Sequence, residues 1–162
     1  MRLSRWLTCM LTCSVLAACT AAPDSETWFH EMKDEDRGRA TFTLDLSDSS
    51  CVYSISLIAR FHKGDRPSSV TMDLSLTSPS GIRGTETVTF PSDYAVLKRY
   101  LKEHPDDSRI CLASTPDYHD ISWAYRDNIQ PSEPGAWLMT VSLPDSSRNL
   151  RGVGLTLSKK HN

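Results

Sequence analysis

Residues 52–61, VYSISLIARF, alternate apolar and small polar side chains. Tyr53, Ile55 and Leu57 are separated by serines, so their side chains fall on one face of an extended strand. A strand that is apolar on one face needs a second layer of structure to cover that face. The stretch therefore predicts a half-buried strand in a layered β protein.

The same pattern recurs along most of the chain. Between the alternating segments lie clusters of Ser, Asp, Gly and Pro, which favour turns. The predicted strands are residues 39–46, 52–61, 70–76, 85–90, 110–113, 121–126, 136–143 and 153–157. Short strands separated by frequent turns predict an all-β protein, an antiparallel β-sandwich of jelly-roll type.

One segment interrupts the strands. Residues 94–104 carry apolar side chains at helical spacing, and Ser92 or Asp93 can cap the first turn. Pro105 ends the segment, because proline disfavours helix at the residue before it. The sequence therefore predicts one short helical insertion. Its apolar positions are Tyr94, Leu97, Tyr100 and Leu101.

The first 18 residues have the features of a secretory signal peptide. Arg2 and Arg5 precede the uncharged apolar run 6–18. That run is shorter than the roughly 20 residues that a helix needs to cross a bilayer. A short buried helix is the alternative interpretation.

The end of this run, Leu16-Ala17-Ala18-Cys19, resembles a bacterial lipobox. In that resemblance Cys19 becomes the first residue of the mature protein and carries acyl chains, which bind the membrane by burying methylene groups. Thr20 follows it instead of Asp, which by the same resemblance favours the outer membrane. We expect a lipid-anchored envelope protein with a tether at 19–27 and one β-sandwich domain at 28–162.

The charge balance argues against nucleic acid as a partner. Loss of Arg2 and Arg5 from 18 basic residues leaves 16 Lys and Arg against 20 Asp and Glu, a net charge of −4. Binding to phosphate backbones depends on a basic patch, and the basic residues here are scattered among acids.

Of the five cysteines, only Cys51 and Cys111 remain after the signal peptide and Cys19 are set aside. Two cysteines in an exported domain favour a disulfide, although a free cysteine is also a common core residue. A zinc site would need His or carboxylate partners at ligand spacing. None lies close to either cysteine in sequence, so we predict no metal site.

The sequence favours a non-catalytic protein without a cofactor. It lacks the nucleophile motifs of common hydrolases and a glycine-rich phosphate loop. Residues 117–120 combine Asp117, His119 and Asp120, which could orient a general base or bind a cation. The same cluster is equally typical of a polar loop. A catalytic triad assembled from distant segments is the remaining alternative, because such triads are defined by geometry and not by order in the sequence.

Three aromatic residues offer a candidate binding site. Trp123 and Tyr125 share one side of an extended segment, and a hairpin could bring Trp137 beside them. If exposed, the three rings would form a stacking platform for a glycan. The alternative is that they belong to the core, the usual place for aromatic residues on alternating strand positions.

Five motifs appear in order along the chain. They are Tyr53-x-Ile55-x-Leu57-x-x-Arg60, Ser78-Pro79-Ser80-Gly81, Trp123-x-Tyr125-x-x-Asn128, Pro134-Gly135-x-Trp137 and Leu150-x-Gly152-Val153-Gly154-Leu155. In this order and spacing the chain resembles the gliding-motility lipoprotein family GldH of the Bacteroidetes. The resemblance implies a structural or accessory component of a cell-envelope machine for motility or secretion, with envelope proteins as partners. A glycan-binding lipoprotein is the alternative expectation.

Overall fold

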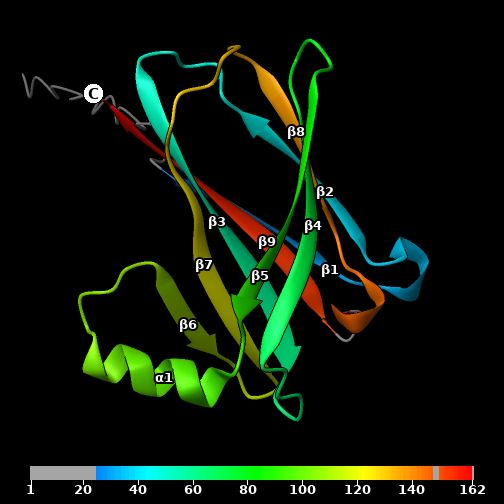
Figure 1. Ribbon diagram of the computed structural model, residues 1–162, viewed down its shortest axis with the longest axis vertical. Coiled ribbons are helices and arrows are strands. Elements are labelled where there is room, and N and C mark those ends of the chain that lie inside the picture. The colour runs from blue at the N-terminus through cyan, green and yellow to red at the C-terminus, as the bar shows by residue number, and fades with distance from the viewer. Residues whose placement is uncertain (1–24, 148–149, 162) are drawn as a thin grey trace, which may run out of the picture.

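The computed structural model describes residues 25–147 and 150–161, which form two antiparallel β-sheets. The five-stranded sheet contains, in spatial order, β1 (Ser25–Glu31), β9 (Gly152–His161), β3 (Cys51–His62), β7 (Tyr118–Ile129) and β6 (Ile110–Ser114). The four-stranded sheet contains β2 (Arg39–Asp45), β8 (Ala136–Ser142), β4 (Ser69–Thr77) and β5 (Arg83–Pro91). Figure 1 shows the two sheets facing each other as layers.

The strand order confirms the predicted β-sandwich. Without β6, the order β1-β9-β3-β7 facing β2-β8-β4-β5 is that of an eight-stranded jelly roll. The chain crosses from one sheet to the other between β1 and β2, β2 and β3, and β3 and β4. Apart from the consecutive pairs β4–β5 and β6–β7, strands that are neighbours in a sheet therefore come from distant parts of the sequence.

The core lies between the sheets and is built around β3. Every second side chain of β3, from Cys51 to Phe61, is buried, and those of Leu57 and Ala59 are fully enclosed. The strands of the other sheet supply the opposing side chains, among them Leu44 and Met72. Complete burial of one such large side chain stabilises the fold by about 1.5–3 kcal/mol. The alternation seen in the sequence therefore stabilises the sandwich by placing one apolar side chain after another in its core.

The structure corrects the predicted start of the domain. Strand β1 begins at Ser25, inside the segment that was expected to be a tether, and pairs with β9 from Ser25 opposite Ser158 onward. β1 is an edge strand with mostly exposed side chains, so it carries little of the apolar alternation on which the prediction depended. Its backbone pairing with β9 defines it instead.

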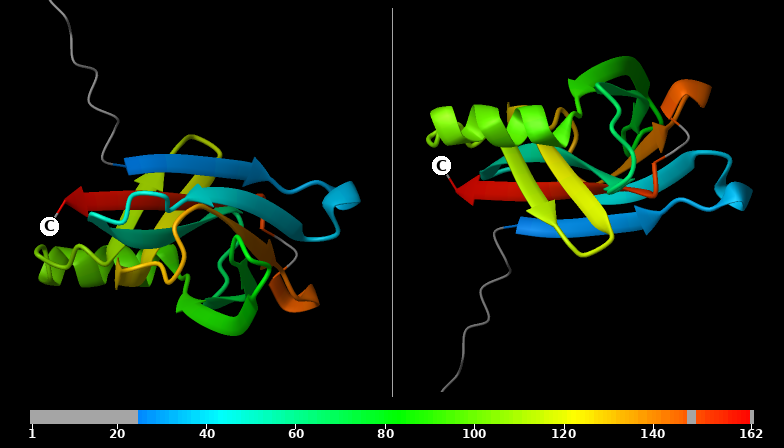
Figure 2. Two further views of the ribbon diagram at one scale, coloured as in Figure 1. Left: turned by 90° about the horizontal axis from the view of Figure 1, so that it is seen from above. Right: turned by 90° about the horizontal axis from the view of Figure 1, so that it is seen from below.

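The predicted helix is present as α1 (Tyr94–Glu103), between β5 and β6. Asp93 caps it by accepting a hydrogen bond of 3.0 Å from the backbone N–H of Val96, and Leu97 is the residue that it buries in the core. In Figure 2, α1 lies beside β6 on the side of the molecule away from the short 3-10 turn η1 (Asp34–Asp36). A second 3-10 turn, η2 (Asp145–Ser147), precedes β9. No helix in the described ranges is long and apolar enough to cross a membrane.

Two glycines let β1 lie close against β9. A Cβ added to Gly154 would stand 2.8 Å from the carbonyl oxygen of Trp28 and 2.9 Å from the ring of Phe29. The Phe29 ring also lies against Gly152 and 4.3 Å from the guanidinium of Arg60. Phe29, on the edge strand β1, thus covers a strip of the neighbouring strand β9 that has no side chains, as an aromatic ring placed across the ladder from a glycine can do.

We therefore expect Gly154→Ala to lower the free energy of unfolding by about 1–3 kcal/mol, because the added methyl group overpacks against backbone that cannot move without breaking the ladder. The measurement is urea denaturation. Gly84→Ala on β5 is the matched control, since no atom lies within 4 Å of the position of its Cβ. Equal stability of the two variants would contradict this account of the glycines.

Candidate binding cleft

A cleft of about 590 Å³ opens between the two sheets, with β3 and β7 on one side and β4, β5 and β8 on the other. Its volume lies within the range of pockets that hold small ligands or the side chains of a partner. Aliphatic and thioether side chains line its interior, and polar side chains lie at its mouth. The apolar residues are Ile55, Leu74, Leu76, Ile129 and Met139.

The cleft forms where β7 departs from regular pairing with β3. The register shifts twice, between Tyr53 and Ile55 and again between Ile55 and Ser56, with the extra residues on β7. Asn128, near the end of β7, has a left-handed backbone with φ 54°. Bulges bend a strand and redirect its side chains. This part of β7 therefore turns Tyr125 and Arg126 toward the mouth of the cleft.

Glu86 on β5 joins the two sheets across that mouth. Its Oε1 accepts a hydrogen bond from the hydroxyl of Tyr125 and another, 2.7 Å long, from the guanidinium of Arg126. The hydrogen bond from Tyr125, followed by that from Arg126, holds the pKa of the Glu86 carboxyl below its ordinary value of 4.5. Burial, and then the contact with Glu86, raises the pKa of the Tyr125 phenol.

The ion pair at the mouth is accessible to solvent. The side chain of Arg126 is 56% exposed and that of Glu86 is 38% exposed. Exposed ion pairs of this kind contribute roughly 0–1 kcal/mol. A partner with an acidic group or a backbone carbonyl can therefore take over the guanidinium at little cost.

One end of the sandwich beside the cleft is tied by the loop before β8. Glu133 accepts hydrogen bonds from the backbone N–H of Ser80 at 3.0 Å and from its hydroxyl at 2.7 Å. Gly135 has φ +134° and lies against Pro79. The Ser-Pro-Ser-Gly and Pro-Gly motifs noted in the sequence thus meet in space, and they hold the β4–β5 turn against the β7–β8 loop.

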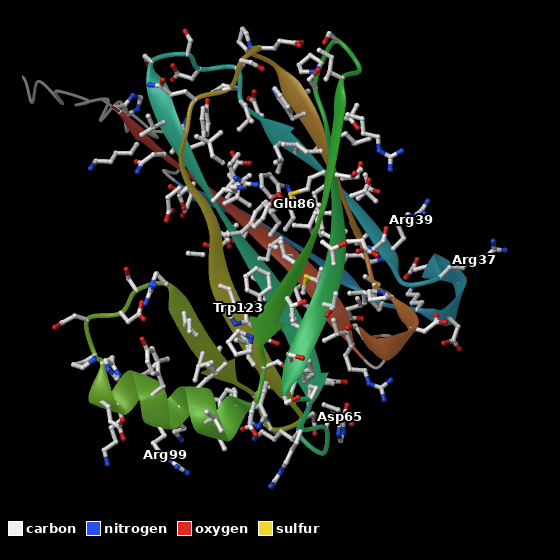
Figure 3. All side chains as sticks on the ribbon, in the orientation of Figure 1. Arg37, Arg39, Asp65, Glu86, Arg99 and Trp123 are labelled. Atoms are coloured by element: carbon white, nitrogen blue, oxygen red, sulfur yellow. The ribbon has the colours of Figure 1, made fainter. Side chains whose placement is uncertain are left out.

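The three candidate aromatic residues do not form an exposed platform. Trp123 is 2% exposed, donates a hydrogen bond of 3.0 Å to the carbonyl of Pro91, and stacks on Phe90. Tyr125 lines the cleft, whereas Trp137 lies on β8 in the other sheet. The predicted hairpin between their segments is wrong, because β7 and β8 belong to different sheets. Figure 3 shows Trp123 and Glu86 at different heights along the strands that face each other.

Asp117 lies in the bend before β7, and the other two members of the cluster at 117–120, His119 and Asp120, are adjacent on β7 and point to its opposite faces. Asp120 makes a two-pronged ion pair with Arg60, both contacts being 2.7 Å. The neighbouring His119 stacks on Tyr94 of α1, with 3.7 Å between ring centroids. Burial, together with the charges of Lys63 and Lys98, lowers the pKa of His119. The carboxylate therefore does not orient the histidine as a general base.

The predicted disulfide is also wrong, since Cys51 and Cys111 are both free. Cys111 lies opposite Ser122, which lies opposite Ile58 on β3. Ile58 is seven residues from Cys51, or about 23 Å along the strand, whereas a disulfide needs Cα atoms within about 7 Å. In addition, Cys51 is buried and Cys111 is exposed.

Sequence reasoning missed Glu86 and Arg126. They are 40 positions apart and join only because β5 and β7 face each other across the sandwich. The one available signal was a glutamate at an inward position of a strand whose other inward side chains are Val88 and Phe90. The predicted lipidation site, Cys19, lies outside the described residues.

No family model, curated protein or solved structure matches the chain.

We expect Trp123→Ala to destabilise the protein by about 3–5 kcal/mol, because it empties a large buried site and leaves the Pro91 carbonyl without its donor. Chemical denaturation measures the loss. Trp123→Phe is the control, since it keeps a ring to stack on Phe90 and loses the hydrogen bond together with only part of the buried volume, so it should cost less than the alanine variant. A loss below about 1 kcal/mol for the alanine variant would mean that Trp123 is not a core residue.

The contribution of Glu86 to stability depends on pH. Because its pKa is lower in the folded state, its contribution is present above the ordinary value of 4.5 and is lost as the pH falls through the folded-state pKa. The difference in unfolding free energy between wild type and Glu86→Gln should therefore shrink from about pH 7 to about pH 3. Tyr125→Phe should reduce the same pH dependence. An unchanged difference across this range would contradict the contacts assigned to Glu86.

Proposed function

We propose that this protein is a non-catalytic lipoprotein of the bacterial cell envelope, a structural or accessory component of a motility or secretion machine, as its resemblance to GldH implies. We propose further that it binds an extended apolar segment of a partner protein in the cleft between its sheets. The observation that carries this proposal is the combination of an apolar cleft with an open strand edge beside it.

Strand β5 supplies the open edge. Within the described residues it pairs with β4 on one side only. A strand edge offers unpaired backbone groups to which an extended peptide can add. The inward side chains of such a peptide would enter the cleft next to Gly84, whose Cβ position has no atom within 4 Å.

The charges at the mouth support a protein as the occupant. Arg126 and Glu86 can each bind a backbone or side-chain group of a peptide once their own contact opens. The apolar interior, with Leu74 and Leu76 from β4, takes up aliphatic side chains. A sugar ring would instead require an exposed aromatic face, and the burial of Trp123 removes the central ring of that alternative.

The proposed anchor places this binding near a membrane. In this interpretation the acyl chains are on Cys19, in the outer membrane, and the first strand begins six residues later at Ser25. Six residues reach at most about 20 Å when fully extended. Partners that meet the domain there are membrane-associated or periplasmic proteins.

Crosslinking in intact cells followed by affinity capture tests the proposal. Gly84→Trp should fill the mouth of the cleft without a backbone clash and should strongly reduce the recovery of specific envelope proteins. Thr41→Trp is the matched control, because Thr41 is an exposed residue on the opposite edge strand, β2. It should leave recovery unchanged.

Two results would contradict the proposal. One is capture of the same proteins by Gly84→Trp, and the other is capture of polysaccharide alone together with glycan binding by the purified protein. The anchor is tested separately by Cys19→Ala, which should abolish fatty-acid incorporation and release the protein from membranes.

A further inference from the structure

A cluster of three potential metal ligands lies at the end of the sandwich where β3 begins. Within the described ranges, Asp48, Cys51 and His161 each offer one ligand atom, and these atoms lie within 4.8 Å of one another. The Sγ atom of Cys51 is 3.2 Å from Nδ1 of His161 and 3.3 Å from Oδ2 of Asp48. None of the three takes part in the cleft.

The fold itself brings these residues together. Cys51 and His161 are direct partners across the ladder between β3 and β9, although they are 110 positions apart in the chain. Cys51 faces the core and is 1% exposed. Asp48 lies in the connection that crosses from β2 in one sheet to β3 in the other, which places its carboxylate over the thiol.

The carboxylate is held in position by its neighbours. Oδ1 of Asp48 accepts hydrogen bonds from the backbone N–H of Ser50 at 3.0 Å and from its hydroxyl at 2.6 Å. The hydroxyl of Tyr53 donates to the Asp48 carbonyl and accepts from the Asp48 N–H, both at 3.1 Å. Oδ2 is therefore directed at the thiol. Outer contacts that orient a ligand in this way are characteristic of metal sites.

The spacing of the ligand atoms suits a tetrahedral ion. With metal–sulfur bonds of about 2.3 Å and metal–nitrogen or metal–oxygen bonds of about 2.0–2.1 Å, tetrahedral ligands are separated by roughly 3.3–3.6 Å. The two distances from Sγ, 3.2 and 3.3 Å, require an opening of a few tenths of an ångström. The ligand atoms of Asp48 and His161, which lie within 4.8 Å of each other, are brought to tetrahedral spacing by a small rotation of the exposed imidazole. His161 is exposed, so solvent can occupy a fourth position, as in zinc sites with three protein ligands.

We propose that Asp48, Cys51 and His161 bind a divalent transition-metal ion of the zinc class, with one coordination position open to water. Thiolate, imidazole and carboxylate are the three ligand types that zinc takes in proteins. On binding, the S–H bond of Cys51 breaks, its proton is released to solvent, and the sulfur donates its electron pair to the metal.

The same residues do not form a cysteine nucleophile with its base. In such a set the carboxylate orients the histidine, whereas Asp48 contacts the thiol itself. Glu26, Asp45 and Asp48 also line a small depression at this end, with Lys159 as its cation, so carboxylates predominate around the site.

Titration of the metal-free full chain with Co²⁺ and with Zn²⁺ tests the proposal. Co²⁺ should give a thiolate charge-transfer band that saturates at one equivalent, and Zn²⁺ should abolish the band and raise the melting temperature by mass action. His161→Ala should weaken binding at least tenfold without unfolding the protein, because His161 is exposed at the end of β9. Cys51→Ser should remove the band.

Cys111→Ser is the matched control, since Cys111 is an exposed thiol far from the cluster, and it should behave as wild type. The proposal is overturned if no saturable band appears, if His161→Ala binds as tightly as wild type, or if the band and the thermal shift survive in Cys51→Ser. In the last case the cysteines of the N-terminal segment would be the source of the signal. Failure of the metal site leaves the cleft proposal intact, because the two share no residue.

Discussion

Burial of one face of β3 between the two sheets is the interaction on which the rest of this structure depends. β3 pairs with β9 on one side and β7 on the other, so its inner side chains lie at the centre of the larger sheet. Leu57 and Ala59 have no exposed surface. The pleat then allows only one register, because a slip by one residue would turn serines inward and leucine outward. Every other strand takes its place relative to this one.

The candidate sites lie where this regular packing ends. At the cleft, β7 leaves its register with β3 through two bulges, and apolar side chains such as Leu76 and Met139 line a space instead of closing it. The contact that spans the mouth, between Glu86 and Arg126, is exposed and weak. A packed core beside a cleft whose mouth is closed only by a weak contact suits binding, since a partner can enter the cleft without disrupting the core.

The start of β3 illustrates a different use of the same strand. There the buried position is held by Cys51 instead of an aliphatic residue, and the crossover from β2 places Asp48 above it. An ion at this point would fasten the crossover from β2 to the adjoining ends of β3 and β9 in the five-stranded sheet. The jelly-roll topology makes such a cluster possible, because it sets strands from distant parts of the chain side by side.

The sequence by itself determined the layered β fold, most of the strands and the capped helix α1, because side-chain alternation and helix capping depend on residues a few positions apart. It did not reveal β1, because the side chains of β1 are mostly exposed and only its backbone pairing with β9 defines it as a strand. Only the tertiary structure decided which strands share a sheet. That arrangement in turn separates the two cysteines, buries Trp123 and brings Glu86 to Arg126. The physical reason is that packing of the two layers, which is a property of the whole chain, sets the distances between residues from 40 to 110 positions apart.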